Sequence, residues 1–303
     1  MNTLNEVTRA KLACAYSGLV WGLFWIPLRQ LEQAGIPGLW ANLTFYLAPL
    51  FIVLPVLPFR WRSIAKGGLD LQLKSMITAL SLICYSVAVL YTEVVRAMLL
   101  FYLTPIWSAL LARLILGDAI TPVRWVAMAI GFAGMVVILN DGVSGLPLPS
   151  TSGDWLAVLS GFGWAVAAVS LRLGKSPDPL ELCSFNFIWS AIFSFSFVAL
   201  FSAATEPAPA LSRMFGILPW LVPTLVLVVM TGMYATMWGA PKLNPGVVGL
   251  LFMTEISVGA ITAAIWSGEP FGYREVIGVV LITAAGAAES IWDLWLRPRW
   301  KRA

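Results

Sequence analysis

Residues 17–29 read SGLVWGLFWIPLR, and residues 160–172 read SGFGWAVAAVSLR. Both stretches begin with Ser-Gly, carry tryptophan at the fifth position and end with Leu-Arg; Ser17 corresponds to Ser160, an offset of 143 residues. Neither stretch contains a charged residue before its final arginine, so each is typical of an apolar helix. A helix of this kind that occurs twice predicts a chain built from two similar halves.

The composition indicates a membrane protein. Of the 303 residues, 59% are hydrophobic and 11% charged, and the mean hydropathy is +0.85, which leaves too little polar surface to cover a soluble globule. A spanning helix needs about 20 residues, so the length allows roughly nine to eleven spans. Apolar runs and their breakers predict ten spans, at about 11–31, 38–58, 70–91, 94–116, 122–139, 153–173, 179–203, 216–239, 245–266 and 271–292.

The basic residues predict the orientation in the membrane. With a cytoplasmic N-terminus, 15 of the 19 Lys and Arg residues fall in loops and ends on the cytoplasmic side, including four after residue 296, and four fall on the other side. Such an excess is typical of cytoplasmic loops. We therefore expect both termini in the cytoplasm and no surface for nucleic acid.

A second repeated pair lies further along the chain. Leu103-Thr104 corresponds to Met253-Thr254 at an offset of 150 residues. Five spans per half is an odd number, so the halves must enter the membrane in opposite directions. The predicted fold class is therefore all-α integral membrane, with ten transmembrane helices as two inverted five-helix repeats, residues 1–148 and residues 149–303.

These repeats carry a family resemblance. The stretches Thr104-Pro105-Ile106-Trp107 to Gly117-Asp118 and Thr254-Glu255 to Gly268-Glu269 resemble the EamA-type repeats of the drug/metabolite transporter (DMT) superfamily. The tryptophan-rich first span and the length are most similar to the YddG-type aromatic amino-acid exporters. Ile256 stands where the family often has proline, which predicts a more regular helix around Glu255. The resemblance implies a multi-pass protein of the bacterial inner membrane that acts as a monomer on a small-molecule substrate.

Glu255 is the main candidate for a functional charge. It lies about ten residues from either end of its predicted span, where a carboxylate costs at least ~2.5 kcal/mol unless it faces a polar cavity or a partner. It could balance a substrate ammonium group, or exchange a proton during the transport cycle. A purely structural role, as a protonated acid donating one hydrogen bond between helices, is the third interpretation.

Aromatic and proline residues at mid-depth are further candidates. A phenol or indole in hydrocarbon needs a hydrogen-bond partner, which favours an inward position. The predicted substrate-binding residues are Trp21, Trp25, Tyr85, Tyr102, Trp164, Tyr234 and Glu255. Prolines within spans kink them and offer hinges, so Pro105 and Pro223 are predicted to contribute to gating.

Together these features predict a secondary exporter of aromatic and other hydrophobic amino acids that works by alternating access through a central cavity. Export of other amphipathic drugs or metabolites is the alternative. An intramembrane enzyme is disfavoured, because the sequence has no histidine and Glu255 is its only central carboxylate. A channel is disfavoured because no polar filter repeat is evident. No metal or cofactor is expected, since the three cysteines are scattered and no phosphate-binding glycine loop is present.

Overall fold

The computed structural model describes residues 2–139, 149–174, 177–202, 207–266 and 272–291, and every regular element within them is helical. In chain order the α-helices are α1 (Asn2–Gly22), α2 (Trp25–Gln33), α3 (Gly38–Leu47), α4 (Leu50–Val56), α5 (Trp61–Tyr91), α6 (Val94–Phe101), α7 (Thr104–Leu116), α8 (Pro122–Leu139), α9 (Ser152–Arg172), α10 (Pro179–Phe197), α11 (Leu211–Thr224), α12 (Thr231–Gly239), α13 (Pro245–Phe252), α14 (Thr254–Trp266) and α15 (Tyr273–Ile291). Short 3₁₀ or π-helical turns at Leu57–Arg60, Val198–Ser202, Leu225–Met230 and Ala240–Lys242 extend or join them.

Seven helical stretches among the described residues are long and apolar enough to cross a membrane, judged by length and composition. One of them, Gly38–Tyr91, contains both the second and the third predicted span, and Pro122–Val137 is apolar but shorter. Large apolar side chains such as Leu114, Phe195 and Leu200 are exposed on the outside of the bundle. Such an exterior is stable against lipid and not against water. The chain is therefore an all-helical, multi-pass membrane protein.

The third predicted span begins where the glycine pair predicts. α5 is bounded by Trp61 and Tyr91, but its backbone is not helical at Gly68, so two helices meet there at a kink. Gly68 has φ +51° and ψ −138°, a conformation that only a residue without Cβ adopts at little cost. The helix that carries the span therefore starts just after the Gly67-Gly68 pair, near residue 70.

Two helices are interrupted near their middle. α6 ends at Phe101 before α7 begins at Thr104, and α13 ends at Phe252 before α14 begins at Thr254. The helix that carries Glu255 is therefore interrupted at Met253, although proline is absent there. The amide of Met253 donates to Leu250 O and the amide of Ile256 donates to Met253 O, both at 3.1 Å. Each bond reaches back three residues, as in a 3₁₀ helix, and not four, as in an α-helix.

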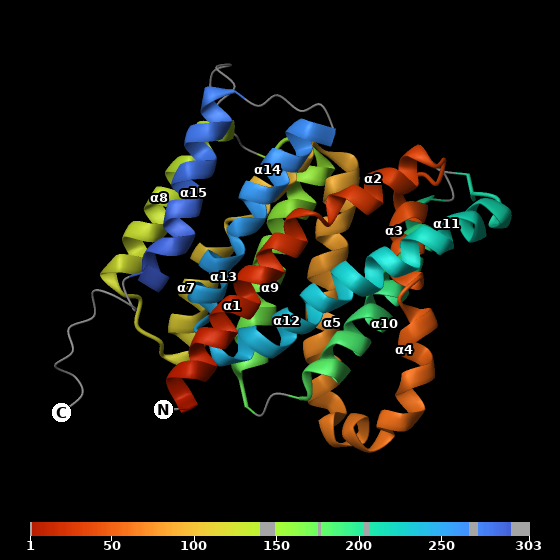
Figure 1. The fold of residues 1–303 in the computed structure, drawn as a ribbon, viewed down its shortest axis with the longest axis horizontal. Helices are drawn as coiled ribbons and strands as arrows, with labels where there is room; N and C mark the ends of the chain where they lie inside the picture. The colour runs from red at the N-terminus through yellow and green to blue at the C-terminus, as the bar shows by residue number, and fades with distance from the viewer. Residues whose placement is uncertain (1, 140–148, 175–176, 203–206, 267–271, 292–303) are drawn as a thin grey trace.

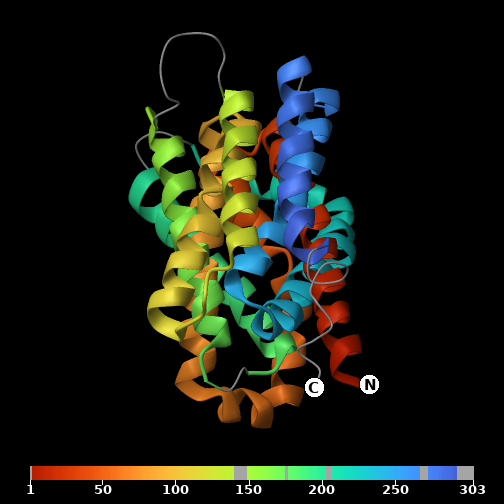
Figure 2. The same ribbon diagram turned by 90° about the vertical axis from the view of Figure 1, so that its left-hand side faces the viewer.

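Two groups of helices, one packed around α1 and the other around α9, share a common core; we call them the two packing groups. In Figures 1 and 2 α8 and α15 run side by side along one edge of the molecule. α1 packs against α12, α13 and α14, whereas α9 packs against α5, α6 and α7. The predicted boundary between the halves adjoins residues 140–148, which lie outside the described residues, as do Gly268, Glu269 and the basic residues after position 296.

Ion pairs lie toward the two ends of the bundle. At one end Arg60 pairs with Glu181 at 2.6 Å and with Asp178 at 3.1 Å. At the opposite end, which we call the Trp266 end, Arg96 pairs with the buried Asp154 at 3.0 Å. Burying a charge in hydrocarbon is costly, so these ion pairs lie at the ends of the bundle, whereas Glu255 lies among uncharged residues in its middle.

Candidate central binding pocket

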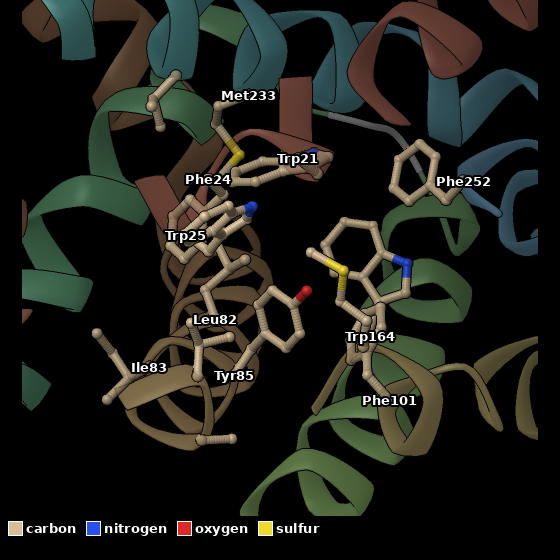
Figure 3. Close-up of a cluster of buried hydrophobic side chains, with 14 of the residues drawn as sticks. Trp21, Phe24, Trp25, Leu82, Ile83, Tyr85, Phe101, Trp164, Met233 and Phe252 are labelled. Atoms are coloured by element: carbon tan, nitrogen blue, oxygen red, sulfur yellow. The ribbon is translucent and has the colours of Figure 1, made fainter. Parts of the chain in front are cut away.

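Glu255 lies in the first turn of α14 and is only 2% exposed. It borders a small cavity between helices from both halves of the chain. This central pocket is lined by Trp21, Leu82, Tyr85, Phe101, Trp164, Phe252 and Glu255. Figure 3 shows the hydroxyl group of Tyr85 directed into the space beside Trp164, with Trp21 approaching from α1. A carboxyl group among rings is suited to an organic cation with a flat apolar part.

Both carboxyl oxygens of Glu255 contact tyrosine hydroxyls. Tyr85 Oη donates to Oε1 at 2.6 Å, and Tyr102 Oη lies 2.7 Å from Oε2. Tyr102 Oη also donates to the carbonyl oxygen of Phe252. A phenol has a single hydrogen, so Tyr102 cannot donate to both acceptors. All three contacts are satisfied together when Glu255 carries a proton on Oε2 and donates it to Tyr102 Oη.

The carbonyl of Phe252 is available because the helix is interrupted at this point. In a continuous helix it would accept from the amide of Ile256, which donates instead to Met253 O. In the first half Pro105 has no amide hydrogen for Phe101 O, and Thr104 Oγ1 donates to that carbonyl at 2.6 Å. Each interrupted helix therefore has a main-chain carbonyl satisfied by a side-chain hydroxyl.

The two tryptophans of the repeat both reach the central pocket. Trp21 Nε1 donates to Thr236 Oγ1 at 3.3 Å, whereas Trp164 Nε1 is buried and has no hydrogen-bond partner among the residues that the structure describes. The ring of Trp164 stacks on Phe252, with centroids 5.6 Å apart and planes inclined by 29°. The indole N–H of Trp164 is thus a free donor on a rigid ring, available to an acceptor on a ligand.

The other predicted site residues are divided among different places. Trp25 does not line the central pocket; its Nε1 donates to Thr262 Oγ1 at 3.1 Å. Tyr234 is 45% exposed on the outside of α12 and does not join the cluster. Pro105 is buried at the start of α7 against Gly249, and Pro223 precedes the π-helical turn after α11.

Sequence reasoning missed three residues that line the central pocket, Leu82, Phe101 and Phe252. The repeat offset contained a signal for one of them, because Tyr102 corresponds to Phe252 at the offset of 150. Leu82 and Phe101 carry no such signal, since an apolar residue in a span reads the same whether it faces lipid or a cavity.

The pocket is nearly closed in this conformation. Its volume is about 20 Å³, and a water molecule needs roughly 10–15 Å³ of such space. No Lys or Arg is among its lining residues. The buried Lys74 is instead bound to Asp70 at 2.8 Å. Within the described residues no group of three His, Cys, Asp or Glu side chains could hold a metal ion. The pocket therefore suits an organic ligand, and the helices must separate to admit one.

The chain matches the model of the EamA-like transporter family twice, over residues 8–140 and 151–287. It belongs to that family. It is 24% identical to the uncharacterized transporter YojE of Bacillus subtilis (strain 168), over 98% of this chain and 97% of YojE. It is 22% identical to the uncharacterized transporter YvbV of the same strain, over 92% and 90% of the two chains.

A solved crystal structure shares the fold of this EamA-like transporter. The two chains superpose with a TM-score of 0.67 at 18% sequence identity, over 96% of this chain and 99% of the other. The family match assigns the chain to the membrane transporters of the DMT superfamily. In this transporter the buried carboxyl group of Glu255 lines the central pocket.

Replacing Tyr102 tests the hydrogen bonds around Glu255. We expect Tyr102→Phe to lower the free energy of unfolding by about 1–3 kcal/mol, because the Phe252 carbonyl and Glu255 Oε2 both lose their partner inside the bundle. Thermal unfolding of the wild type and the variant, purified in the same detergent, measures this loss of stability. The matched control is Tyr234→Phe, whose hydroxyl lies on the exposed face of α12. Equal melting temperatures for the two variants would contradict the proposed bonds.

Proposed function

We propose that this chain is a secondary exporter of aromatic and other hydrophobic amino acids, as the resemblance to YddG-type exporters implies. The observation that carries the proposal is a buried carboxyl group beside aromatic rings from both halves of the chain. The rings would hold a flat side chain by stacking and edge contacts. Glu255 would balance the ammonium group and exchange a proton when the substrate leaves. Trp164 Nε1 would donate to the substrate carboxylate.

We infer further that residues 1–148 and 149–303 are inverted repeats of five spans each. Equivalent contacts occur with the halves exchanged: Ser17 Oγ donates to Gly232 O at 3.0 Å, and Ser160 Oγ donates to Ser81 O at 2.8 Å. The donors differ by 143 residues and the acceptors by 151, close to the offsets of the sequence repeats. A two-fold axis in the membrane plane would produce this exchange.

The close-packed glycines support the same symmetry. A Cβ built on Gly18 would lie 2.1 Å from Thr254 Oγ1, and one built on Gly161 would lie 2.3 Å from Phe101 O and 3.0 Å from Thr104 Oγ1. Gly18 and Gly161 are repeat-related, as are Thr254 and Thr104. The first helix of each half therefore packs on the interrupted helix of the other half.

These contacts support transport by alternating access. Because the central pocket is too small for an amino acid, transport requires the two packing groups to move apart on one side and then on the other. The interrupted helices at Pro105 and at Met253, together with the π-helical turn after Pro223, are the places where the backbone can bend. With both termini in the cytoplasm of a bacterium, the Trp266 end would face outward.

Flux into proteoliposomes tests this function. We expect protein-dependent, saturable uptake of labelled Phe, Trp or Tyr that is at least about tenfold faster than that of Asp, because the pocket holds a carboxyl group and no cation. Empty liposomes provide the background. Absence of flux for all three aromatic amino acids would reject the substrate assignment.

One observation favours a second candidate, the export of other amphipathic amines. A zwitterionic substrate brings a carboxylate, but the lining of the central pocket has no Lys or Arg to balance it. An aromatic amine would need only Glu255 and the rings. In a competition experiment, phenethylamine would inhibit uptake of labelled Phe more strongly than unlabelled Phe does if amines are the preferred substrates, and more weakly if amino acids are.

A further inference from the structure

A second and larger cavity lies at the Trp266 end of the bundle. Its volume is about 620 Å³, within the range of about 300–1,000 Å³ typical of small-molecule sites. We call it the Glu93 cavity. Its lining includes Trp25, Arg29, Gln33, Tyr91, Glu93 and Trp266. Unlike the central pocket, it has room for a substrate in this conformation.

The charge in this cavity is set by Glu93. The Arg29 guanidinium pairs with Glu32 at 3.1 Å and donates to Thr92 O at 3.2 Å, so its charge is already balanced. Arg96, one turn further along the chain, is bound to Asp154. Glu93 precedes α6 without capping it through its side chain, and it forms no ion pair with a described residue. Among the described residues, the cavity therefore keeps one carboxylate that no ion pair balances.

Aromatic rings lie around that carboxylate. Trp25, Tyr91 and Trp266 all line the cavity, and Trp266 is 61% exposed, so much of its surface is not covered by described residues. Rings attract an ammonium group through their faces and an aromatic side chain by stacking. A carboxylate combined with rings is the same chemistry as that of the central pocket.

Trp25 lines the Glu93 cavity and lies one helical turn beyond Trp21, which lines the central pocket. Its bond to Thr262 joins α2 to α14, the helix that also carries Glu255 and Trp266. A ligand in the Glu93 cavity would thus contact a residue that is bonded to the helix carrying Glu255.

We propose that the Glu93 cavity is a second binding site for the substrate class of the central pocket, a primary ammonium group attached to an aromatic side chain. The inference rests on the proposed function for that class. Glu93 binds the ammonium group, and Trp266 and Tyr91 hold the ring.

Calorimetric titration of the purified protein with phenethylamine tests the proposal. We expect two binding sites in the wild type, with Glu93→Gln and Trp266→Leu each weakening one site by roughly tenfold or more. Glu255→Gln should weaken binding at the central pocket only. Glu275→Gln is the matched control, because Glu275, like Glu93, lies at the N-terminal end of a helix but does not line the cavity.

The outcomes separate the two proposals. Binding that is lost in Glu255→Gln and unchanged in Glu93→Gln would overturn the second site and leave the proposed function standing. Binding that is lost only in Glu93→Gln would support the cavity and contradict the role of the central pocket. Absence of phenethylamine binding to the wild type would overturn the second site, whereas the proposed function is tested separately by the flux of labelled Phe, Trp and Tyr. In transport assays, Glu93→Gln should raise KM with kcat unchanged.

Discussion

Glu255→Gln should abolish the acceleration of transport by a pH gradient while leaving the protein folded. Glutamine cannot release a proton, but its amide reproduces the bonds of the protonated acid: the side-chain oxygen accepts from Tyr85, and the amide nitrogen donates to Tyr102. Tyr102 then still donates to Phe252 O. We expect the gradient-driven rate to fall at least about tenfold, a loss of roughly 1.4 kcal/mol or more in coupling.

The measurement is uptake by proteoliposomes with and without an imposed pH gradient. The wild type should respond to the gradient, and the glutamine variant should transport at the same rate in both conditions. Glu275→Gln, which removes a carboxylate from the first turn of α15, serves as the control and should retain the response. A wild type insensitive to the gradient, or a glutamine variant that still responds, would exclude proton exchange by Glu255 and leave it a role in balancing the substrate ammonium group or a structural role.

Gly161→Ala should cause the largest loss of stability among small substitutions in the bundle. Alanine normally stabilises a helix by about 1 kcal/mol relative to glycine. At Gly161, however, the new methyl group would lie 2.3 Å from the carbonyl oxygen of Phe101, a main-chain atom in the partner helix. Relieving this overlap requires the helices to move apart, at a cost of about 1–3 kcal/mol or more.

The matched control for this prediction is Gly216→Ala in α11. A Cβ at Gly216 meets no atom within 4 Å, so alanine there should be neutral or slightly stabilising. Gly18→Ala should resemble Gly161→Ala, because its Cβ would meet Thr254 Oγ1 at 2.1 Å. Thermal unfolding of the three variants in the same detergent measures the differences. A melting temperature for Gly161→Ala at or above that of Gly216→Ala would contradict the packing described here.

The composition and the glycine pattern of the sequence predicted much of the fold. The all-helical, multi-pass character follows from the apolar content, and the family resemblance rested on short motifs that the family match supports. Sequence reasoning also placed Trp21, Tyr85, Trp164 and Glu255 in one pocket, since each is a polar or amphipathic group that is costly to leave in lipid. It could not separate Tyr234 from them, because a tyrosine near mid-span reads the same whether it faces inward or outward.

The sequence by itself determined that the chain lies in a membrane, that it is helical, and that Glu255 lies near the middle of its predicted span. These features depend on the local length and polarity of each segment. Tertiary structure alone decided which groups meet. Tyr102 Oη lies between Phe252 O and Glu255 Oε2, α13 ends without a proline, and Glu93 forms no ion pair with a described residue while Arg96 binds Asp154. The physical reason is separation along the chain. Tyr102 and Glu255 are 153 residues apart, and Arg96 and Asp154 are 58 residues apart. No local pattern in the sequence specifies which faces of such distant helices lie together.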